Sequence, residues 1–139
     1  MKSTSVTISN LGEHVEKTVT LNGWVYNKRT SGKIWFLLLR DGTGLAQCVV
    51  VKAEVEPVIF ELKNTITQES SVTITGTVRK DDRSVGGFEI GVESIKIHQI
   101  ADEYPISPKE HGTDFLMNHR HLWMRSRKQH SILTVRHHV

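Results

Sequence analysis

The chain has 139 residues, of which 37% are hydrophobic and 24% are charged, and this size suits one compact domain with an appendage. It is too short for a large enzyme with a complete substrate site. The single cysteine, Cys48, excludes a disulfide framework and a zinc cluster built on thiolates. No apolar run approaches the roughly 18 residues of a membrane helix, and the N-terminus lacks the apolar stretch of a signal peptide. We therefore expect a cytoplasmic protein with no membrane partner.

The charge is distributed unevenly along the chain. Residues 1–114 hold 13 Lys and Arg against 15 Asp and Glu, a balance of −2, whereas residues 115–139 hold five Lys and Arg and no acid, a balance of +5. The two balances add up to the formal net charge of +3. The tail is therefore a separate electrostatic unit, and any basic patch on the first part must be local.

Alternation of apolar and polar residues dominates residues 18–100 and predicts five strands. We place these strands at about 18–26, 33–40, 45–51, 71–79 and 88–97. The stretch between the first two strands, residues 28–33, supplies turn residues, with Gly32 at the expected positive φ. In the last strand the apolar phase slips by one residue near Glu93 and Ser94, which predicts a β-bulge.

A change of period between the third and fourth strands predicts a helix of about ten residues, with Pro57 in its first turn. Its apolar positions are Val55, Val58, Ile59, Leu62 and Ile66. Three strands, a helix and two strands is the order of an OB-fold, a five-stranded barrel. Gly23 and Gly76, each in mid-strand, suit the coiling that closes so small a barrel. An SH3-like barrel does not need this helix, and a ferredoxin-like fold would place a helix after the first strand.

The fold class that we predict is all-β with a helical appendage, and the domain boundaries follow from it. Residues 1–100 form the barrel domain, and residues 101–112, with prolines and a glycine, read as a linker. A short helix capped by Thr113 or Asp114 is expected to reach about His121. A second helix is expected over residues 127–139.

The second helix places Ile132, Val135 and Val139 on one stripe, with Leu133 beside it. The chain stops within this helix on an apolar residue. We therefore expect residues 113–139 to be a hinge and the truncated beginning of a further domain.

The second strand is apolar on both faces, whereas a small antiparallel barrel buries only one face of each strand. If Trp35, Leu37 and Leu39 fill the core, then their neighbours point outward. These neighbours are Ile34, Phe36 and Leu38. An outward aromatic on this strand of an OB barrel is where the bases of single-stranded nucleic acid stack. The alternative is that another domain covers this face.

The charged residues near Phe36 in the sequence are all basic, since residues 17–40 contain no acid. The basic residues nearby are Lys28, Arg29, Lys33 and Arg40. Gln47, at the beginning of the third strand, can point to the same face, and its amide can read a Watson–Crick edge. Together these groups predict a site for single-stranded RNA or DNA. Cys48 alternates inward and is expected to be a small core residue.

The eight histidines do not predict a metal site. Six of them lie between His111 and Val139, at spacings that match no closed site and with no cysteine among them. The chain also lacks a nucleotide-binding loop of Walker type and a Ser–His–Asp order. We therefore predict no catalytic residue, no metal ligand and no cofactor for this chain.

Two stretches resemble a known family. The first, GWVYNKRTSGKIWFLLLRDGTGLAQCVV at residues 23–50, closely resembles the anticodon-binding OB domain of class IIb aminoacyl-tRNA synthetases. The second, YPISPKEHGTDFLMNHRHLWMRS at residues 104–126, is most similar to asparaginyl-tRNA synthetases, with aspartyl enzymes of the archaeal type a close second. The resemblance covers nearly the whole chain.

The resemblance implies a role for four residues. Phe36 corresponds to the aromatic that stacks on the central anticodon uridine, and Gln47 to the glutamine that reads this base. Arg29 corresponds to the basic residue at the end of the first strand, and Glu89 to an acid on the fifth strand that contacts the neighbouring anticodon base in aspartyl relatives. With the two lysines selected by charge, the predicted anticodon-binding residues are Lys28, Arg29, Lys33, Phe36, Gln47 and Glu89.

The implied function is anticodon recognition for an asparagine–tRNA ligase. The whole enzyme would be a homodimer that attaches asparagine to tRNA with ATP and magnesium, and both ATP and asparagine would bind in a catalytic domain that this chain lacks. Two alternatives stay open: the N-terminal domain of an aspartate–tRNA ligase, and a free-standing OB module that binds single-stranded RNA or DNA without catalysis.

Overall fold

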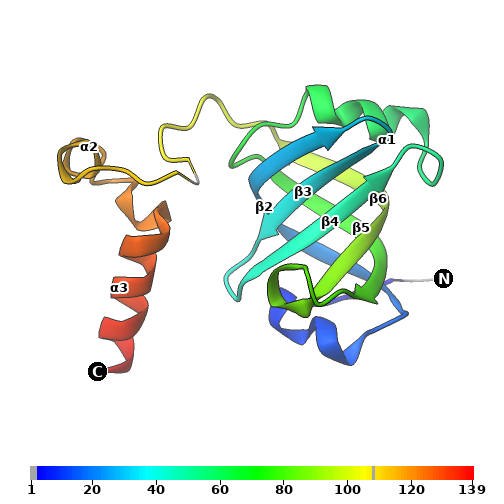
Figure 1. Cartoon of the computed structure of the whole chain (residues 1–139), viewed down its shortest axis with the longest axis horizontal. Coiled ribbons are helices and arrows are strands. Elements are labelled where there is room, and N and C mark those ends of the chain that lie inside the picture. The colour runs from blue at the N-terminus through cyan, green and yellow to red at the C-terminus, as the bar shows by residue number, and fades with distance from the viewer. Residues whose placement is uncertain (1–2, 108) are drawn as a thin grey trace. The chain divides into compact units, whose positions relative to one another are not determined.

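The computed structural model describes residues 3–107 and 109–139. Residues 1, 2 and 108, which fall in the predicted barrel domain and linker, lie outside the described residues. The chain divides into two compact units, Met1–Glu103 and Tyr104–Val139, which are described separately (Figure 1).

The first unit is built on six strands. They are β1 (Thr4–Ser5), β2 (Thr18–Ser31), β3 (Ile34–Arg40), β4 (Leu45–Val51), β5 (Ser71–Lys80) and β6 (Phe88–Gln99). Their order is β1-β2-β3-β4-β6-β5, and β2 also pairs with β5, so five strands close into a ring of hydrogen-bonded neighbours. The two-residue strand β1, which the sequence did not predict, adds to β2 in parallel.

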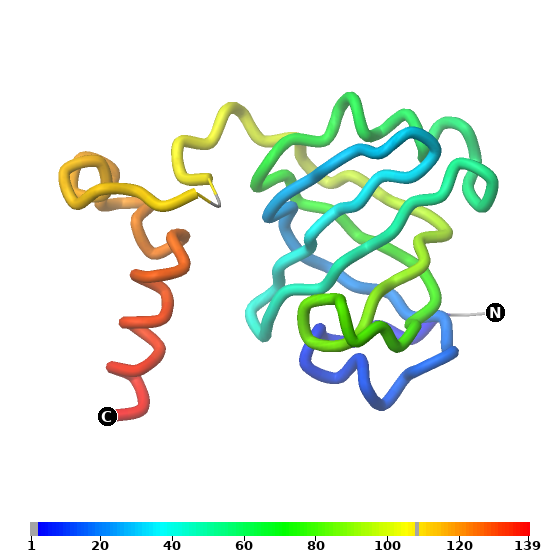
Figure 2. Tube along the Cα trace, in the orientation of Figure 1, coloured from blue at the N-terminus to red at the C-terminus, as the bar shows by residue number. Residues whose placement is uncertain are grey.

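Strand β2 continues to Ser31, so the predicted end at Tyr26 is wrong. The strand pairs with β5 as far as Trp24 and with β3 from Trp24 to Ser31, with a bulge between Val25 and Asn27 inside the second pairing. Beyond the bulge a run of polar residues continues the strand. The turn is therefore only Gly32 and Lys33, and Gly32 has the predicted positive φ, at 59°. Figure 2 follows this hairpin from β2 into β3.

The predicted bulge in β6 is confirmed. Ser94 pairs with Thr75 and Val92 pairs with Gly76, which leaves Glu93 as the extra residue. Such a bulge increases the local twist of the strand. Next to it, a Cβ on Gly76 would lie 2.3 Å from the carbonyl oxygen of Gly91, so no larger residue fits where β5 and β6 approach.

The helix between β4 and β5 is shorter than expected. It consists of α1 (Pro57–Glu61) followed by a 3₁₀ turn, η2 (Leu62–Asn64). Pro57 begins the helix as predicted, and four of the five expected apolar positions pack against the core or lie in it: Val55, Ile59, Leu62 and Ile66. Val58, expected on the apolar face, is 63% exposed, whereas Phe60 is 3% exposed and joins the core. Two further 3₁₀ segments are η1 (Ile8–Glu13) and η3 (Val85–Gly87).

The core lies inside the ring of strands and receives inward residues from all five of them. Trp35, Leu37 and Leu39 have no exposed surface, as the alternation along β3 predicts. Cys48 is equally buried, and burial raises the pKa of its thiol to about 12. This side chain is therefore a neutral thiol in the core at physiological pH.

The second unit contains α2 (Thr113–Asn118), the 3₁₀ turn η4 (Trp123–Arg125) and α3 (Arg127–His138). The predicted capping residue of α2 is wrong, since Gly112 precedes the helix and no side chain caps it. The helix also ends before His121. In α3, which is confirmed, the Ser126 hydroxyl accepts a hydrogen bond from the backbone N–H of Gln129 at 3.4 Å.

The apolar residues of α3 are exposed along its whole length. These residues are Ile132, Leu133 and Val135, and Val139 follows the helix. None of the helices in the described part of the chain is long and apolar enough to span a membrane.

Candidate nucleic-acid interface

Two rows of residues cross the outward face of β2, β3, β4 and β6, and we call this surface the two-row face. The first row is Arg29, Phe36, Val49 and Gly91, and the second is Asn27, Leu38, Gln47 and Glu89. Each residue pairs with the next in its row, and paired residues on neighbouring strands point to the same side of a sheet. The core residues of β3 alternate with Phe36 and Leu38, so both of these point away from the core.

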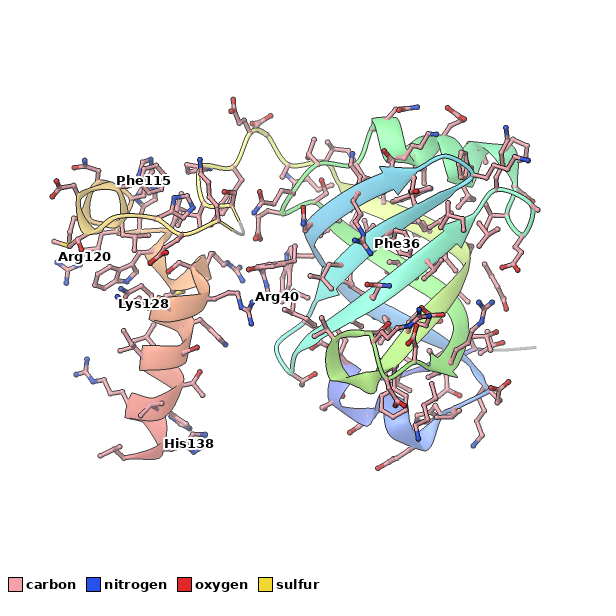
Figure 3. The ribbon with its side chains drawn as sticks, viewed as in Figure 1. Phe36, Arg40, Phe115, Arg120, Lys128 and His138 are labelled. Carbon is pink, nitrogen blue, oxygen red and sulfur yellow. The ribbon has the colours of Figure 1, made fainter. Side chains whose placement is uncertain are left out.

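Phe36 lies at the centre of the first row, on strand β3 (Figure 3). It is half-buried, and the Arg29 guanidinium lies over its ring with the Cζ atom 4.5 Å from the ring centroid. A cation–π contact at an exposed site is worth about 0.5–1 kcal/mol. In the free protein the Arg29 guanidinium therefore covers a ring face on which a base could stack, but the contact that holds it there is weak.

Gln47 lies in the second row, between Leu38 and Glu89. Phe36 pairs with Val49, two residues along β4, so Gln47 and Phe36 are diagonal neighbours whose backbones lie about 7–8 Å apart. Glu89 is half-buried beside it on β6. The structure therefore brings Arg29, Phe36, Gln47 and Glu89, which the sequence singled out, to one surface.

Lys33 and Arg40 lie at opposite ends of β3. Lys33 is exposed in the hairpin turn that joins Arg29's strand to Phe36's strand. Arg40, labelled in Figure 3, donates to both carboxylate oxygens of Glu69 at 2.8 and 2.7 Å, and it also lies 5.7 Å from the centroid of the Trp24 ring. Its side chain is only 15% exposed, so Arg40 holds the fold together at this end of the ring.

Comparison with known proteins identifies the family. Residues 19–97, more than half of the chain, match the family described as OB-fold nucleic acid binding domain. The chain belongs to this family. The matched range contains all the strands of the closed ring except the first residue of β2 and the last two of β6.

Two similar sequences support the resemblance to asparaginyl-tRNA synthetases. The chain is 54% identical over 134 residues to the asparagine–tRNA ligase of Symbiobacterium thermophilum and 56% identical over 129 residues to that of Desulforamulus reducens. These matches cover 96% and 93% of this chain but only 31% and 30% of the relatives. The chain therefore spans about a third of the length of the curated relatives that it matches.

A solved structure gives the same result. The crystal structure of asparaginyl-tRNA synthetase from Pyrococcus horikoshii matches with a TM-score of 0.81 at 38% sequence identity. The match covers 94% of this chain and 32% of that protein. The predicted resemblance is thus confirmed both by sequence and by fold.

In this OB-fold domain Lys28 does not reach the two-row face. It pairs with the core residue Leu37, so it points to the other side of β2. Its ammonium donates to the backbone carbonyls of Lys63 and Ile66 at 2.5 and 2.7 Å, and burial lowers its pKa below the ordinary value. The bulge before Asn27 causes this reversal, and no local pattern indicates it because the neighbouring residues are polar on both faces.

One cation on this side of the domain was missed from the sequence. Arg79 on β5 pairs with Glu89, so it extends the second row by one strand. Alternation along β5 already places Arg79 outward, opposite to the buried Val78. Its neighbours, however, come from β6 and from the loop after β4, and the sequence does not show which residues those strands bring together.

We expect Lys28→Met to reduce stability and to spare RNA binding. Methionine keeps most of the alkyl stem but removes the two hydrogen bonds to the Lys63 and Ile66 carbonyls. A hydrogen bond to a charged group contributes about 1.5–3 kcal/mol, and we expect a loss of this order in the free energy of unfolding, measured in urea. Lys33→Met removes the same charge at an exposed position and should change stability little. Equal stability of the two variants would contradict the role given to Lys28.

Proposed function

We propose that this domain binds the anticodon loop of a tRNA and belongs to an asparagine–tRNA ligase that attaches asparagine to that tRNA. The observation that carries the proposal is the half-buried Phe36 beneath Arg29, on the outward face of a domain whose relatives are asparagine–tRNA ligases. We further infer that the closed ring of strands is the five-stranded OB barrel, with α1 between its third and fourth strands.

Binding begins with an exchange at Phe36. A base of the unpaired loop stacks on the ring in place of the Arg29 guanidinium. Stacking of a base on an aromatic side chain is worth about 1–3 kcal/mol, more than the roughly 0.5–1 kcal/mol of an exposed cation–π contact. The displaced guanidinium keeps its charge and its five donors, so it can bind a phosphate of the same loop.

Base identity is read by Gln47. Its amide offers a donor and an acceptor to the uracil edge, and it lies diagonally across from Phe36, within reach of a base stacked there. Arg29 and Lys33 contribute mainly through charge, which favours any RNA sequence. Glu89, an acceptor when ionised, suits an exocyclic amino group of the neighbouring base.

We assign the chemistry of the ligase to the two thirds of such an enzyme that this chain does not match. Adenylate formation needs ATP and Mg²⁺ there. Within residues 3–107 and 109–139, no group of three or more His, Cys, Asp or Glu side chains is placed to hold a metal ion. A cytoplasmic location and a homodimeric ligase accompany this proposal.

The first test of the function is Phe36→Ala. We expect this variant to bind an anticodon stem–loop RNA with uridine at the anticodon centre about 5- to 150-fold more weakly, because one stacking contact is lost. Fluorescence anisotropy of labelled RNA measures the affinity. Val58→Ala truncates an apolar side chain that is 63% exposed on α1 and should bind as the wild type does. Unchanged affinity of a folded Phe36→Ala variant would remove the support for the site.

The second test separates specificity from affinity. The wild type should prefer a central uridine to a central cytidine, and Gln47→Ala should lose most of this preference. Arg29→Ala should weaken both RNAs alike and reduce the slope of log affinity against log salt by about 0.7, the value for one contact to a single strand. If Gln47→Ala still discriminates between the two bases, then a different group reads the central base.

A further inference from the structure

The Arg79 guanidinium lies over the backbone of Gly91, in space that any side chain at residue 91 would occupy. A Cβ on Gly91 would lie 2.4 Å from Nη2, 2.7 Å from Cζ and 3.0 Å from Nε of Arg79. Because three atoms of the guanidinium lie this close to one point above the backbone, the planar group lies against the strand at Gly91. The Arg79 side chain is 43% exposed, and because one face of the guanidinium lies on the strand, this exposure falls on its outer face and its edges.

The partners of Arg79 hold this orientation without burying it. Nη2 lies 3.6 Å from a carboxylate oxygen of Glu54, whose side chain is 53% exposed, in the loop after β4. Ion pairs between exposed groups are worth about 0–1 kcal/mol, so this one leaves the guanidinium free to take another partner. Glu89, the cross-strand neighbour of Arg79, carries the second acid near it.

Gly91, over which the Arg79 guanidinium lies, belongs to the same row as Phe36. Phe36 pairs with Val49, and Val49 pairs with Gly91. Two strand spacings, about 10 Å, therefore separate Phe36 from Gly91. Arg29 lies on the other side of Phe36, on β2. The first row therefore carries two flat surfaces that face outward, an aromatic ring and a guanidinium plane.

We propose that Arg79 is a second stacking platform, on which a base adjacent to the central anticodon base lies while Glu89 contacts its edge. Unpaired RNA bases stack on arginine planes as well as on aromatic rings. The inference rests on the proposed function, because it needs the RNA loop to lie along the first row. It assigns to Arg79 and Gly91 a role in RNA binding that charge alone does not require.

The experiment measures the affinity of the full chain for the anticodon stem–loop RNA with five variants. Arg79→Gln removes the plane and the charge, Arg79→Lys keeps only the charge, and Gly91→Ala keeps both but displaces the plane. The atoms that a Cβ at Gly91 would meet are the end of a flexible side chain, so the strand need not move. Arg83→Gln removes one charge at a side chain that is 93% exposed in the adjoining loop and is the matched control. Phe36→Ala reports on the parent site.

We expect Arg79→Gln, Arg79→Lys and Gly91→Ala each to bind at least about fivefold more weakly than the wild type, and Arg83→Gln to bind nearly as well. An abasic nucleotide on one side of the central uridine should weaken the wild type by a similar factor. That RNA should then no longer distinguish Arg79→Lys from the wild type, because the stacked base is already missing.

Two results would overturn the inference and leave the proposed function intact. The first is binding by Arg79→Lys or Gly91→Ala that equals the wild type while Phe36→Ala is weak, which would make Arg79 a simple phosphate contact. The second is an additive loss when Arg79→Lys is combined with an abasic nucleotide at each of the two flanking positions in turn, with non-additivity at neither. No binding by the wild type, or no effect of Phe36→Ala, would instead overturn the proposed function and the inference with it.

Discussion

The site depends on one constraint: a strand in a closed ring has a single inward face. Strand β3 is apolar at six successive positions, residues 34–39, and only three of them fit inside. Trp35, Leu37 and Leu39 are fully buried, so Phe36 must lie outside. A one-residue slip of β3 would exchange the two sets and turn every inward side chain outward. The core that stabilises the domain therefore also fixes the position of the stacking aromatic.

Burial separates the cations that hold the fold from those that can meet RNA. The Arg40–Glu69 pair has side chains 15% and 10% exposed and two short hydrogen bonds, and the Lys28 ammonium is held by two carbonyls. The Arg79–Glu54 pair is 43% and 53% exposed at 3.6 Å, and Arg29 is exposed above Phe36. Lys28 and Arg40 would lose well-formed hydrogen bonds if their side chains moved to contact RNA. Arg79 and Arg29 would lose only weak contacts, so RNA can replace the partners of these two residues at a small cost in free energy.

Features that depend on local periodicity could be predicted from the sequence. The ring strands apart from the end of β2, the bulge at Glu93, the turn at Gly32 and the inward residues of β3 all depend on neighbours in the chain, and the structure confirms them. The features that were missed depend on tertiary contacts. Phe60 of α1 packs into the core where the sequence had favoured Val58, and the two-residue strand β1 has almost no pattern to detect.

The candidate site shows the same division. Phe36 and Gln47 could be chosen because they alternate with core residues, whereas Arg29 was chosen by its charge and by the family resemblance. The orientation of Lys28 could not be predicted, because the bulge in β2 is followed by a stretch of polar residues. In such a stretch no apolar residue indicates which side chains point inward. Arg79 needed the pairing of β5 with β6 and the missing side chain of Gly91, a contact between residues 12 apart that only the register shows.

The central claim is that RNA lies on the two-row face, and NMR of the isotope-labelled full chain titrated with the anticodon stem–loop tests it directly. The largest chemical-shift changes should occur at Phe36, Gln47 and Glu89 and at the Arg29 side-chain Nε–H. The outward threonines of β5 that lie beside the first half of β2, Thr73 and Thr75, should change little. Shifts centred on those threonines or on α3, with Phe36 and Gln47 unchanged, would contradict the account.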